Sequence, residues 1–330
     1  MSKQSVLTKM FIIPVVAVAT LLAASNVQKA QAEDVTYLLP APPFLPAFAP
    51  WMLAKARGYY KSEGLNVKFQ MARGGVDVAK QVGAGNAVVG GGIGDTSMIV
   101  RPNGIPVKAV AVLGGGSLMH LTAHADRGIN GPADLKGKTV TTLAFQDTTF
   151  YALLGMLASQ GLSRKDINAQ AAGPAGVWKL FMAGKADAMA SVPDWTAIAI
   201  GAGKKVKIFP ADDYFKSMAQ AILVADKTIK ENPALVQKLV RATLKGMAGI
   251  MNDPDQATKD YTAFVAKNKG KDKYIKSVFA MYNKYVYPGQ KKIGAMDRAR
   301  LASLQKFYVK SGIVRKAQPL DDLYTNQFIQ

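Results

Sequence analysis

Turns that follow predicted strands carry the side chains best suited to binding a small molecule. Two of them, 94–97 and 146–149, combine an aspartate with hydroxyl groups and precede predicted helices. Free N–H groups at a helix N-terminus bind anionic oxygens, whereas a carboxylate accepts hydrogen bonds from an amino group. Two further turns, 42–44 and 192–195, also end strands. The predicted ligand-binding residues are Pro43, Phe44, Gly94, Asp95, Thr96, Gln146, Asp147, Thr148, Thr149, Asp194 and Trp195.

Each of these turns also has an interpretation that needs no ligand. The Pro-Pro-Phe run at 42–44 is consistent with a rigid turn, and Asp95 is consistent with an ordinary helix cap. Trp195 is either a wall for the body of the ligand or a core residue, because aromatic side chains are common in cores. Trp178 is a weaker candidate of the same kind. The sequence leaves these alternatives open.

The residue inventory argues against catalysis. The chain contains no cysteine, which excludes a thiolate nucleophile, a disulfide framework and thiolate metal sites. The only two histidines, His120 and His124, share one face of a predicted strand and have no carboxylate cluster beside them. No Gly-x-Ser-x-Gly elbow or Gly-x-x-x-x-Gly-Lys loop is present. We therefore predict no enzymatic activity, no cofactor and no metal site.

Strands alternate with short helices over the first two thirds of the chain. This alternation predicts an α/β fold with a mainly parallel sheet, whose carboxyl strand ends leave a crevice for a ligand. The predicted strands are 35–39, 67–71, 87–93, 107–113, 118–125, 139–143, 186–191, 206–209 and 219–225.

A weak internal repeat suggests two units built on one plan. Ala183–Ala188 echoes Ala84–Val89, and each segment leads from a helix into a strand that ends at a polar turn. Residues 226–330 are predicted to be almost entirely helical. Asn232-Pro233 and Asp253-Pro254 each supply an N-cap and a proline at the first helical position.

The opening segment resembles a known protein family. A Pro-rich loop precedes Ala54–Val67, which fits the pattern A-x-x-x-G-(Y/F)-(Y/F)-x-x-E-G-L-x-V. This sequence pattern is similar to the one found in periplasmic substrate-binding proteins of ABC importers for sulfonates, taurine, nitrate and thiamine precursors. The resemblance implies a two-lobed, type II-like fold with the C-terminal helices packed on the first lobe. It implies a first lobe of 33–125 with 226–330, a second lobe of 126–225, and crossing strands near Leu121–Ala125 and Ala221–Ala225.

The resemblance also bears on the ligand. In that family the turn equivalent to 146–149 often carries Ser or Thr residues that bind sulfonate or phosphate oxygens. Here Asp95, Asp147 and Asp194 fall in the predicted site turns without an arginine, which disfavours a strongly anionic ligand such as nitrate. A zwitterion such as taurine and an amino-bearing heteroaromatic such as a pyrimidine both remain possible. The fungal thiamine-precursor synthase of the same fold depends on a cysteine-rich motif, which this chain lacks.

The N-terminus predicts export. Residues 1–32 combine Lys3 and Lys9, an uncharged and mostly apolar stretch Met10–Ala24, and small residues at 30–32, which is typical of a cleavable signal peptide. Without cysteine the chain cannot carry a lipoprotein anchor. We therefore expect a periplasmic monomer that delivers a small solute to an ABC permease in the inner membrane. A carrier or sensor partner of the same fold is the alternative.

The net charge of +20 does not indicate nucleic-acid binding. More than half of it lies in the helical residues 226–330, spread as lysine along amphipathic segments such as 267–273. No nucleic-acid recognition motif accompanies the charge. Solubility and long-range attraction of anions are its expected consequences.

Overall fold

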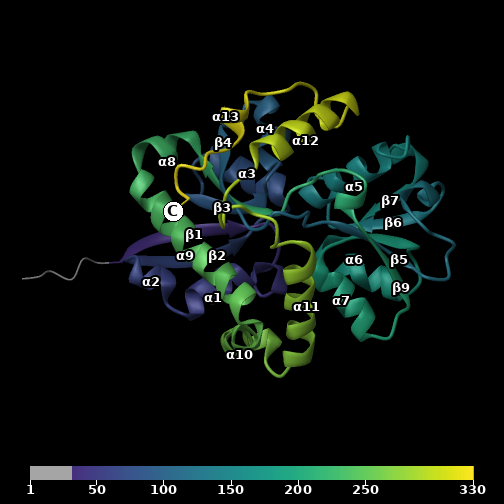
Figure 1. The fold of residues 1–330 in the computed structure, drawn as a ribbon, viewed down its shortest axis with the longest axis horizontal. Helices are drawn as coiled ribbons and strands as arrows, with labels where there is room; N and C mark the ends of the chain where they lie inside the picture. The colour runs from purple at the N-terminus through teal and green to yellow at the C-terminus, as the bar shows by residue number, and fades with distance from the viewer. Residues whose placement is uncertain (1–31, 330) are drawn as a thin grey trace, which may run out of the picture. The chain divides into compact units, whose positions relative to one another are not determined.

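Two five-stranded sheets carry the fold in residues 32–329, the part of the chain that the computed structural model describes (Figure 1). The predicted signal peptide, residues 1–32, lies outside the described part except for its last residue. The first sheet has the order β2-β1-β3-β10-β4, and the second has the order β7-β6-β8-β5-β9. The strands are β1 Glu33–Leu39, β2 Leu65–Met71, β3 Val89–Ile93, β4 Val107–Val112, β5 His120–His124, β6 Thr139–Thr142, β7 Asn168–Ala171, β8 Ala188–Ser191, β9 Val206–Pro210 and β10 Gln220–Ala225.

The two sheets share one plan, as the internal repeat predicts. In each sheet four strands point the same way, and one strand, β10 or β5, runs antiparallel between its neighbours. The repeated segments Ala84–Val89 and Ala183–Ala188 lead into β3 and β8, which hold equivalent central positions. The predicted α/β class with two mainly parallel sheets is confirmed.

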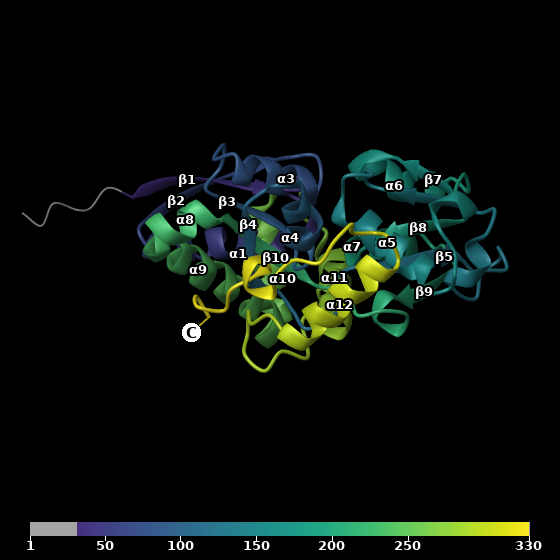
Figure 2. The same ribbon diagram turned by 90° about the horizontal axis from the view of Figure 1, so that it is seen from above.

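Helices cover both sheets (Figures 1 and 2). The long C-terminal helix α9 packs on α1 and α2 of the first lobe, and α10 packs on α1. One C-terminal helix, α11, also packs on α7 of the second lobe. The helices are α1 Ala49–Ala56, α2 Tyr59–Ser62, α3 Gly75–Gly83, α4 Thr96–Val100, α5 Thr148–Ala158, α6 Gly173–Met182, α7 Pro193–Gly201, α8 Asp226–Glu231, α9 Pro233–Asn252, α10 Pro254–Phe264, α11 Asp272–Tyr285, α12 Arg298–Lys310 and α13 Leu320–Leu323.

Local sequence accounts for the ends of the long C-terminal helices. Asn232 accepts a hydrogen bond from the main-chain N–H of Leu235, and Asp253 accepts one from Gln256, which confirms both predicted caps. Among the helices of residues 32–329, none combines the length and the apolar character needed to cross a bilayer.

The elements absent from the sequence-based prediction include the edge strand β7 and helix α7. The edge strand β7 (Asn-Ala-Gln-Ala) has no buried residue, so no alternating hydrophobic pattern marks it. Helix α7 was interpreted only as a turn at 192–195, because its residues are apolar on all sides and show no helical periodicity.

The chain crosses between the two sheets twice, and the crossing points differ from the expected ones. Hydrogen bonding places Leu121–His124 in the second sheet and Ala221–Ala225 in the first, so each expected lobe boundary moves by one strand. The crossing segments are instead residues 113–119 and 211–219. They lie side by side, because Leu118 N–H donates to the Met218 carbonyl at 3.1 Å.

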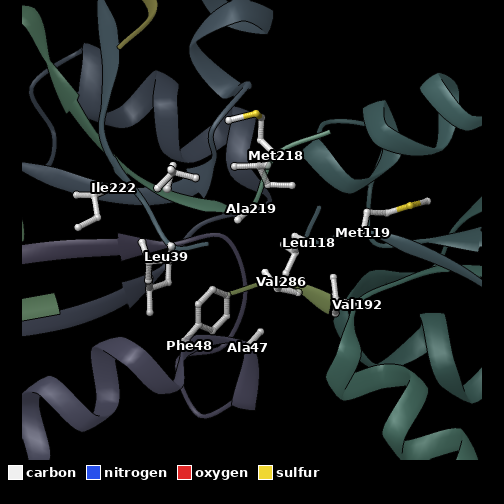
Figure 3. Close-up of a cluster of buried hydrophobic side chains, with 14 of the residues drawn as sticks. Leu39, Ala47, Phe48, Leu118, Met119, Val192, Met218, Ala219, Ile222 and Val286 are labelled. Carbon is white, nitrogen blue, oxygen red and sulfur yellow. The ribbon is translucent and has the colours of Figure 1, made fainter. Parts of the chain in front are cut away.

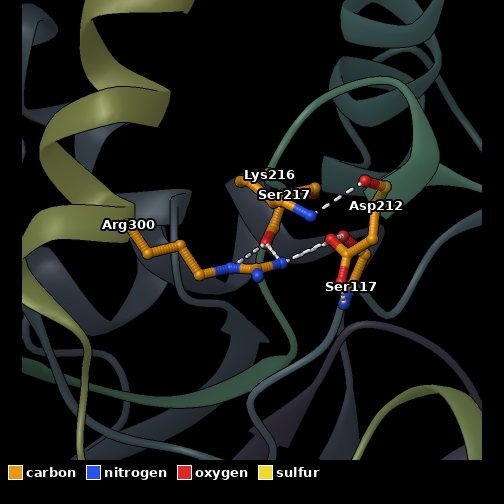
Figure 4. Close-up of polar contacts among 5 residues, drawn as sticks. All are labelled: Ser117, Asp212, Lys216, Ser217 and Arg300. Atoms are coloured by element: carbon orange, nitrogen blue, oxygen red, sulfur yellow. Dashed lines mark hydrogen bonds and ion pairs between the residues drawn. The ribbon is translucent and has the colours of Figure 1, made fainter. Parts of the chain in front are cut away.

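Arg300 of α12 joins the two crossing segments (Figure 4). Its guanidinium donates to the Ser217 carbonyl at 2.7 Å and to Asp212 Oδ1 at 2.5 Å. Asp212 in turn accepts hydrogen bonds from the main-chain N–H and the hydroxyl of Ser117. We call Arg300, Asp212, Ser117 and Ser217 the hinge clasp.

The glycine run 114–116 serves close packing in the first crossing segment. A Cβ on Gly116 would lie 2.1 Å from the carbonyl oxygen of Tyr285, and one on Gly115 would lie 2.5 Å from that of Pro288. The segment after α11 therefore packs directly on the crossing backbone, where only glycine fits.

Candidate ligand-binding site

A cavity of about 50 Å³ lies between the two lobes, at the edges where their strands end. The first lobe contributes the loop after β1 and the end of β3, and the second lobe contributes the N-termini of α5 and α7. The crossing segments supply Leu118 and the residue that opens β10, Gln220. The lining residues are Pro40, Ala41, Leu45, Ala47, Phe48, Gly92, Ile93, Leu118, Leu143, Asp147, Thr148, Thr149, Val192, Asp194, Trp195 and Gln220.

The lobes are closed on each other around this cavity. The main-chain N–H of Val76 in α3 donates to the Gln146 carbonyl at 3.3 Å, and that of Gly75 donates to Asp147 Oδ2 at 3.4 Å. A Cβ on Gly75 would approach Thr148 Oγ1 to 3.0 Å, so glycine permits this contact. The enclosed space is well below the roughly 300–1,000 Å³ that is usual for small-molecule sites.

Apolar side chains from both lobes form most of the walls (Figure 3). Phe48 and Ala47 come from the loop after β1, Leu118 from a crossing segment, and Val192 from the second lobe. Each is buried, with at most 7% of its surface exposed. Such walls match the apolar part of a small molecule. In sites of this kind the few polar groups determine which molecule binds.

Asp147 occupies the N-terminus of α5. Its Oδ1 accepts hydrogen bonds from the main-chain N–H and the hydroxyl of Thr149. Burial raises the pKa of Asp147, and the hydrogen bonds from Thr149 and Gly75 oppose that rise. Because this carboxylate already fills the helix N-terminus, an anionic ligand group would meet a like charge there.

Asp194 lies in the first turn of α7 and differs sharply from Asp147. It is fully buried, and neither of its carboxylate oxygens has a hydrogen-bond partner among residues 32–329. Burial raises the pKa of Asp194 from 3.8 to about 7, and the residue's own main-chain N–H offsets this rise only slightly, at a geometry too poor to count as a hydrogen bond. Such an unpaired acceptor is costly unless a bound molecule supplies donors.

Tyrosines of the C-terminal helices surround Asp194 without pairing with its carboxylate. The Tyr274 hydroxyl donates to the main-chain carbonyl of Asp194 at 3.2 Å, and the hydroxyls of Tyr282 and Tyr287 have no partner in the described part of the chain. Burial, reinforced by the nearby Asp194, raises the pKa of Tyr282 and of Tyr287. These tyrosines therefore stay neutral and supply no positive charge.

Two more polar atoms of the lining residues are unpaired within residues 32–329. Gln220 donates through Nε2 to the Ala47 carbonyl at 2.9 Å, and its Oε1 has no partner. The indole N–H of Trp195 is also without an acceptor. No lysine, arginine or histidine belongs to the described residues that line the cavity.

The structure brings five of the eleven predicted residues to the cavity: Asp147, Thr148, Thr149, Asp194 and Trp195. Ligand contact by these five remains a prediction. Trp195 lines the cavity and is 4% exposed, so it is buried like a core residue, and its role as a wall for a ligand stays a prediction.

The other six predicted residues do not line the cavity. Phe44 points its carbonyl at the Tyr261 hydroxyl, 2.8 Å away, and Gln146 uses its carbonyl to contact α3. Asp95 is fully buried and accepts a hydrogen bond from the Tyr308 hydroxyl at 2.9 Å; burial raises its pKa to about 6, and this hydrogen bond opposes the rise. Thr96 accepts a hydrogen bond from the Ile93 N–H. Pro43 and Gly94 complete the six.

Sequence reasoning missed the first lobe's main contribution. Pro40 and Ala41 directly follow β1, so the strand-end rule could have identified them, but the Pro-Pro-Phe run drew the prediction three residues too far. Gln220 carried no comparable signal. It opens an antiparallel strand and reaches the cavity only because β10 runs against its neighbours.

The histidines have internal partners. His120 Nε2 lies 2.7 Å from Thr196 Oγ1, and His124 Nε2 lies 2.7 Å from the Phe181 carbonyl. Burial lowers the pKa of His120 to about 3, so it is neutral. Within residues 32–329, no group of three or more His, Asp or Glu side chains is arranged to hold a metal ion.

A larger hollow of about 680 Å³ lies beside α12 and the 289–297 loop. Its lining comes from the first lobe and the crossing segments and includes none of the residues at the N-termini of α5 and α7. Both of its arginines form ion pairs, Arg298 with Asp321 and Arg300 with Asp212. The second lobe's helix N-termini therefore do not contribute to this hollow, whereas both lobes line the smaller cavity.

Comparison with known proteins agrees with this architecture. The chain is 26% identical over 296 residues to the riboflavin-binding protein RibY of Chloroflexus aurantiacus, covering 86% of this chain and 82% of RibY. It is 23% identical to the 4-amino-5-hydroxymethyl-2-methylpyrimidine phosphate synthase THI13 of Saccharomyces cerevisiae, covering 90% and 88% of the two chains.

Solved structures show the same fold. The alkanesulfonate-binding protein SsuA of Xanthomonas axonopodis pv. citri superimposes with a TM-score of 0.68 at 16% identity, covering 90% of this chain and 99% of SsuA. The family described as NMT1/THI5 like matches residues 45–257. The chain thus has the two-lobed fold of periplasmic binding proteins and belongs to the NMT1/THI5 like family.

Proposed function

We propose that this chain is a periplasmic solute-binding protein, which captures a small polar organic molecule between its lobes and delivers it to an ABC importer. The observation that carries the proposal is the cavity between the lobes, where apolar walls from both lobes meet a few unpaired polar groups. Such a combination is typical of small-molecule sites. A taurine-like zwitterion and an amino-pyrimidine-like compound are the two ligand types that this proposal covers.

Capture works by hinge closure. The lobes are joined by two adjacent crossing segments, so rotation there opens the cavity without unfolding either sheet. A ligand that contacts both lobes binds the closed form more tightly than the open form and shifts the population towards it. The closed face then docks on the permease.

The family also contains a synthase, so an enzymatic role needs a separate argument. The resemblance implies that the fungal enzyme uses a cysteine-rich motif, and this chain contains no cysteine. Binding alone is therefore the function that we propose. A carrier or sensor partner that feeds no transporter remains the second candidate, because it would use the same cavity.

Mass spectrometry of molecules released from the natively purified protein would identify the ligand. Scattering should then show a smaller radius of gyration when that molecule is added, and uptake of the molecule by cells should require the gene. An unchanged radius at saturation would refute closure. Binding and closure without any effect on uptake would favour the carrier or sensor role.

The turn at the N-terminus of α5 offers a direct test of the cavity. Replacing Thr148→Ala together with Thr149→Ala should weaken binding of the identified molecule by about tenfold, because both residues line the cavity. The free energy of unfolding should change by only about 1 kcal/mol. Unaltered affinity in calorimetry would remove this turn from the site.

A further inference from the structure

The unpaired carboxylate of Asp194 distinguishes this cavity from an ordinary buried space. The fold buries the carboxylate of Asp194, a residue of the cavity lining, yet provides neither oxygen with a side-chain hydrogen-bond partner among residues 32–329. Its position in the first turn of α7 gives only partial compensation through the helix dipole. A buried carboxyl group of this kind either takes up a proton or stays ionised by pairing with a donor.

We propose that Asp194 selects the ligand by accepting hydrogen bonds from its N–H groups, and that the protein takes a small amine or amino-substituted heterocycle without an acidic group. The same unpaired carboxylate opposes closure of the lobes around an empty cavity. The inference rests on the proposed capture function and names the ligand class within it.

The balance of acceptors and donors in the cavity supports this class. The unpaired acceptors are both oxygens of Asp194 and Oε1 of Gln220, whereas the one unpaired donor of the described lining side chains is the Trp195 indole N–H. A ligand with two or three N–H groups matches this arrangement. An ammonium group and an amino group beside a protonated ring nitrogen both qualify.

The same balance excludes an anionic end. A sulfonate or carboxylate needs several donors or a cation, and no basic side chain lies among the described residues of the lining. The N-termini of α5 and α7, where an anion would otherwise bind, hold Asp147 and Asp194 themselves. A zwitterion such as taurine could satisfy Asp194 but would leave its sulfonate without partners.

The groups around Asp194 do not replace the ligand. The tyrosines that face it are Tyr261 of α10, Tyr274 and Tyr282 of α11, and Tyr287 after α11. Two of their hydroxyls are used elsewhere, since Tyr261 donates to the Phe44 carbonyl and Tyr274 to the main chain of Asp194. All are neutral, so above a pH of about 7, where Asp194 is ionised, its negative charge stays uncompensated in the empty closed form.

Closure then depends on the ligand. In an open arrangement the carboxylate is freely hydrated, whereas closure limits its hydration to what a space of about 50 Å³ can hold. A ligand with N–H groups removes this penalty and stabilises the closed form. A ligand without N–H groups does not, so Asp194 makes closure selective.

The test compares Asp194→Asn with Asp187→Asn. Asp187 lies at the opposite end of β8, bonds to the Thr139 N–H and Arg127, and does not line the cavity. The probes are benzamidine and 4-aminopyrimidine, with benzenesulfonate and taurine as anionic counterparts, measured by calorimetry and by scattering. Thermal unfolding verifies that both variants fold.

We expect the wild type and Asp187→Asn to bind at least one of the two amino probes equally well and to become more compact. Asp194→Asn should bind that probe about 30-fold more weakly or worse, since a charged acceptor is lost. Without any probe, Asp194→Asn should be more compact than the wild type, because a neutral amide removes the penalty of closing.

Three results would overturn the inference: tighter binding of benzenesulfonate or taurine, equal affinity of Asp194→Asn, and no binding of either amino probe at millimolar concentration. Closure of the wild type around an anionic probe would overturn only the ligand class and leave the capture function intact. The capture function itself fails if no molecule from a periplasmic extract binds or compacts the protein.

Discussion

Replacing Asp194 with asparagine should stabilise the protein in a strongly pH-dependent way. Burial raises the pKa of Asp194 in the folded chain from 3.8 to about 7. Proton binding to this carboxylate therefore favours the folded state. The favourable contribution is fully present below pH 3.8 and is lost as the pH rises through about 7.

The size of the effect follows from the two pKa values. A difference of about 3 pKa units corresponds to about 4 kcal/mol at pH 8, at 1.36 kcal/mol per unit. At pH 5 the wild-type carboxylate is mostly protonated in the fold, and the same linkage gives about 2 kcal/mol. The gain from Asp194→Asn should therefore be about 2 kcal/mol larger at pH 8 than at pH 5. Opening of the lobes hydrates the carboxylate, so this value is an upper bound.

Urea unfolding of ligand-free wild type and Asp194→Asn at both pH values provides the measurement. Comparing the two proteins at each pH cancels the titration of every other group. Asp187→Asn serves as the control, and its difference from the wild type should not follow this pH dependence. Equal pH dependence of the wild type and Asp194→Asn would refute the conclusion that the carboxylate is buried without a partner.

Two further predictions concern the hinge. Arg300→Met should lower the free energy of unfolding by about 2 kcal/mol, because Arg300 and Asp212 are only partly exposed, with 15% and 26% of their side-chain surfaces accessible. In a double-mutant cycle with Asp212→Asn the two should couple by about 1 kcal/mol, and strictly additive costs would contradict the hinge clasp. Gly116→Ala should destabilise by about 1–3 kcal/mol, since its Cβ would meet a carbonyl oxygen at 2.1 Å. The control Gly201→Ala, in α7 with no atom within 4 Å of the new Cβ, should stabilise by about 1 kcal/mol in thermal unfolding, and equal effects of the two substitutions would contradict this packing.

Features with strong local patterns were predictable from the sequence. Hydrophobic runs between turns identified nine of the ten strands, and the Asn232 and Asp253 caps fixed where two helices begin. The repeat between Ala84–Val89 and Ala183–Ala188 correctly predicted two sheets of one plan. These features depend on interactions within a few residues, so the local sequence specifies them.

Features that depend on pairing between distant segments were not predictable. The sequence marks 118–125 and 219–225 as strands, yet it does not show that each runs antiparallel inside its sheet. That pairing moved the crossing points away from the expected strands and placed Gln220 in the cavity. The β7 edge strand escaped detection for a different reason, since it lacks a buried face and so shows no alternating hydrophobic pattern.

The candidate site also combines features that the local sequence specifies with features that depend on contacts between distant segments. The sequence by itself determined that aspartates and threonines follow the strands of both halves, and that cysteine chemistry is excluded. Only the tertiary structure decided that Asp95 faces a tyrosine, that Asp147 is bonded within its own turn, and that Asp194 is buried without a partner. The reason is physical: the chemical identity of an aspartate is local, whereas its hydrogen-bond partners and its hydration depend on which distant elements pack around it.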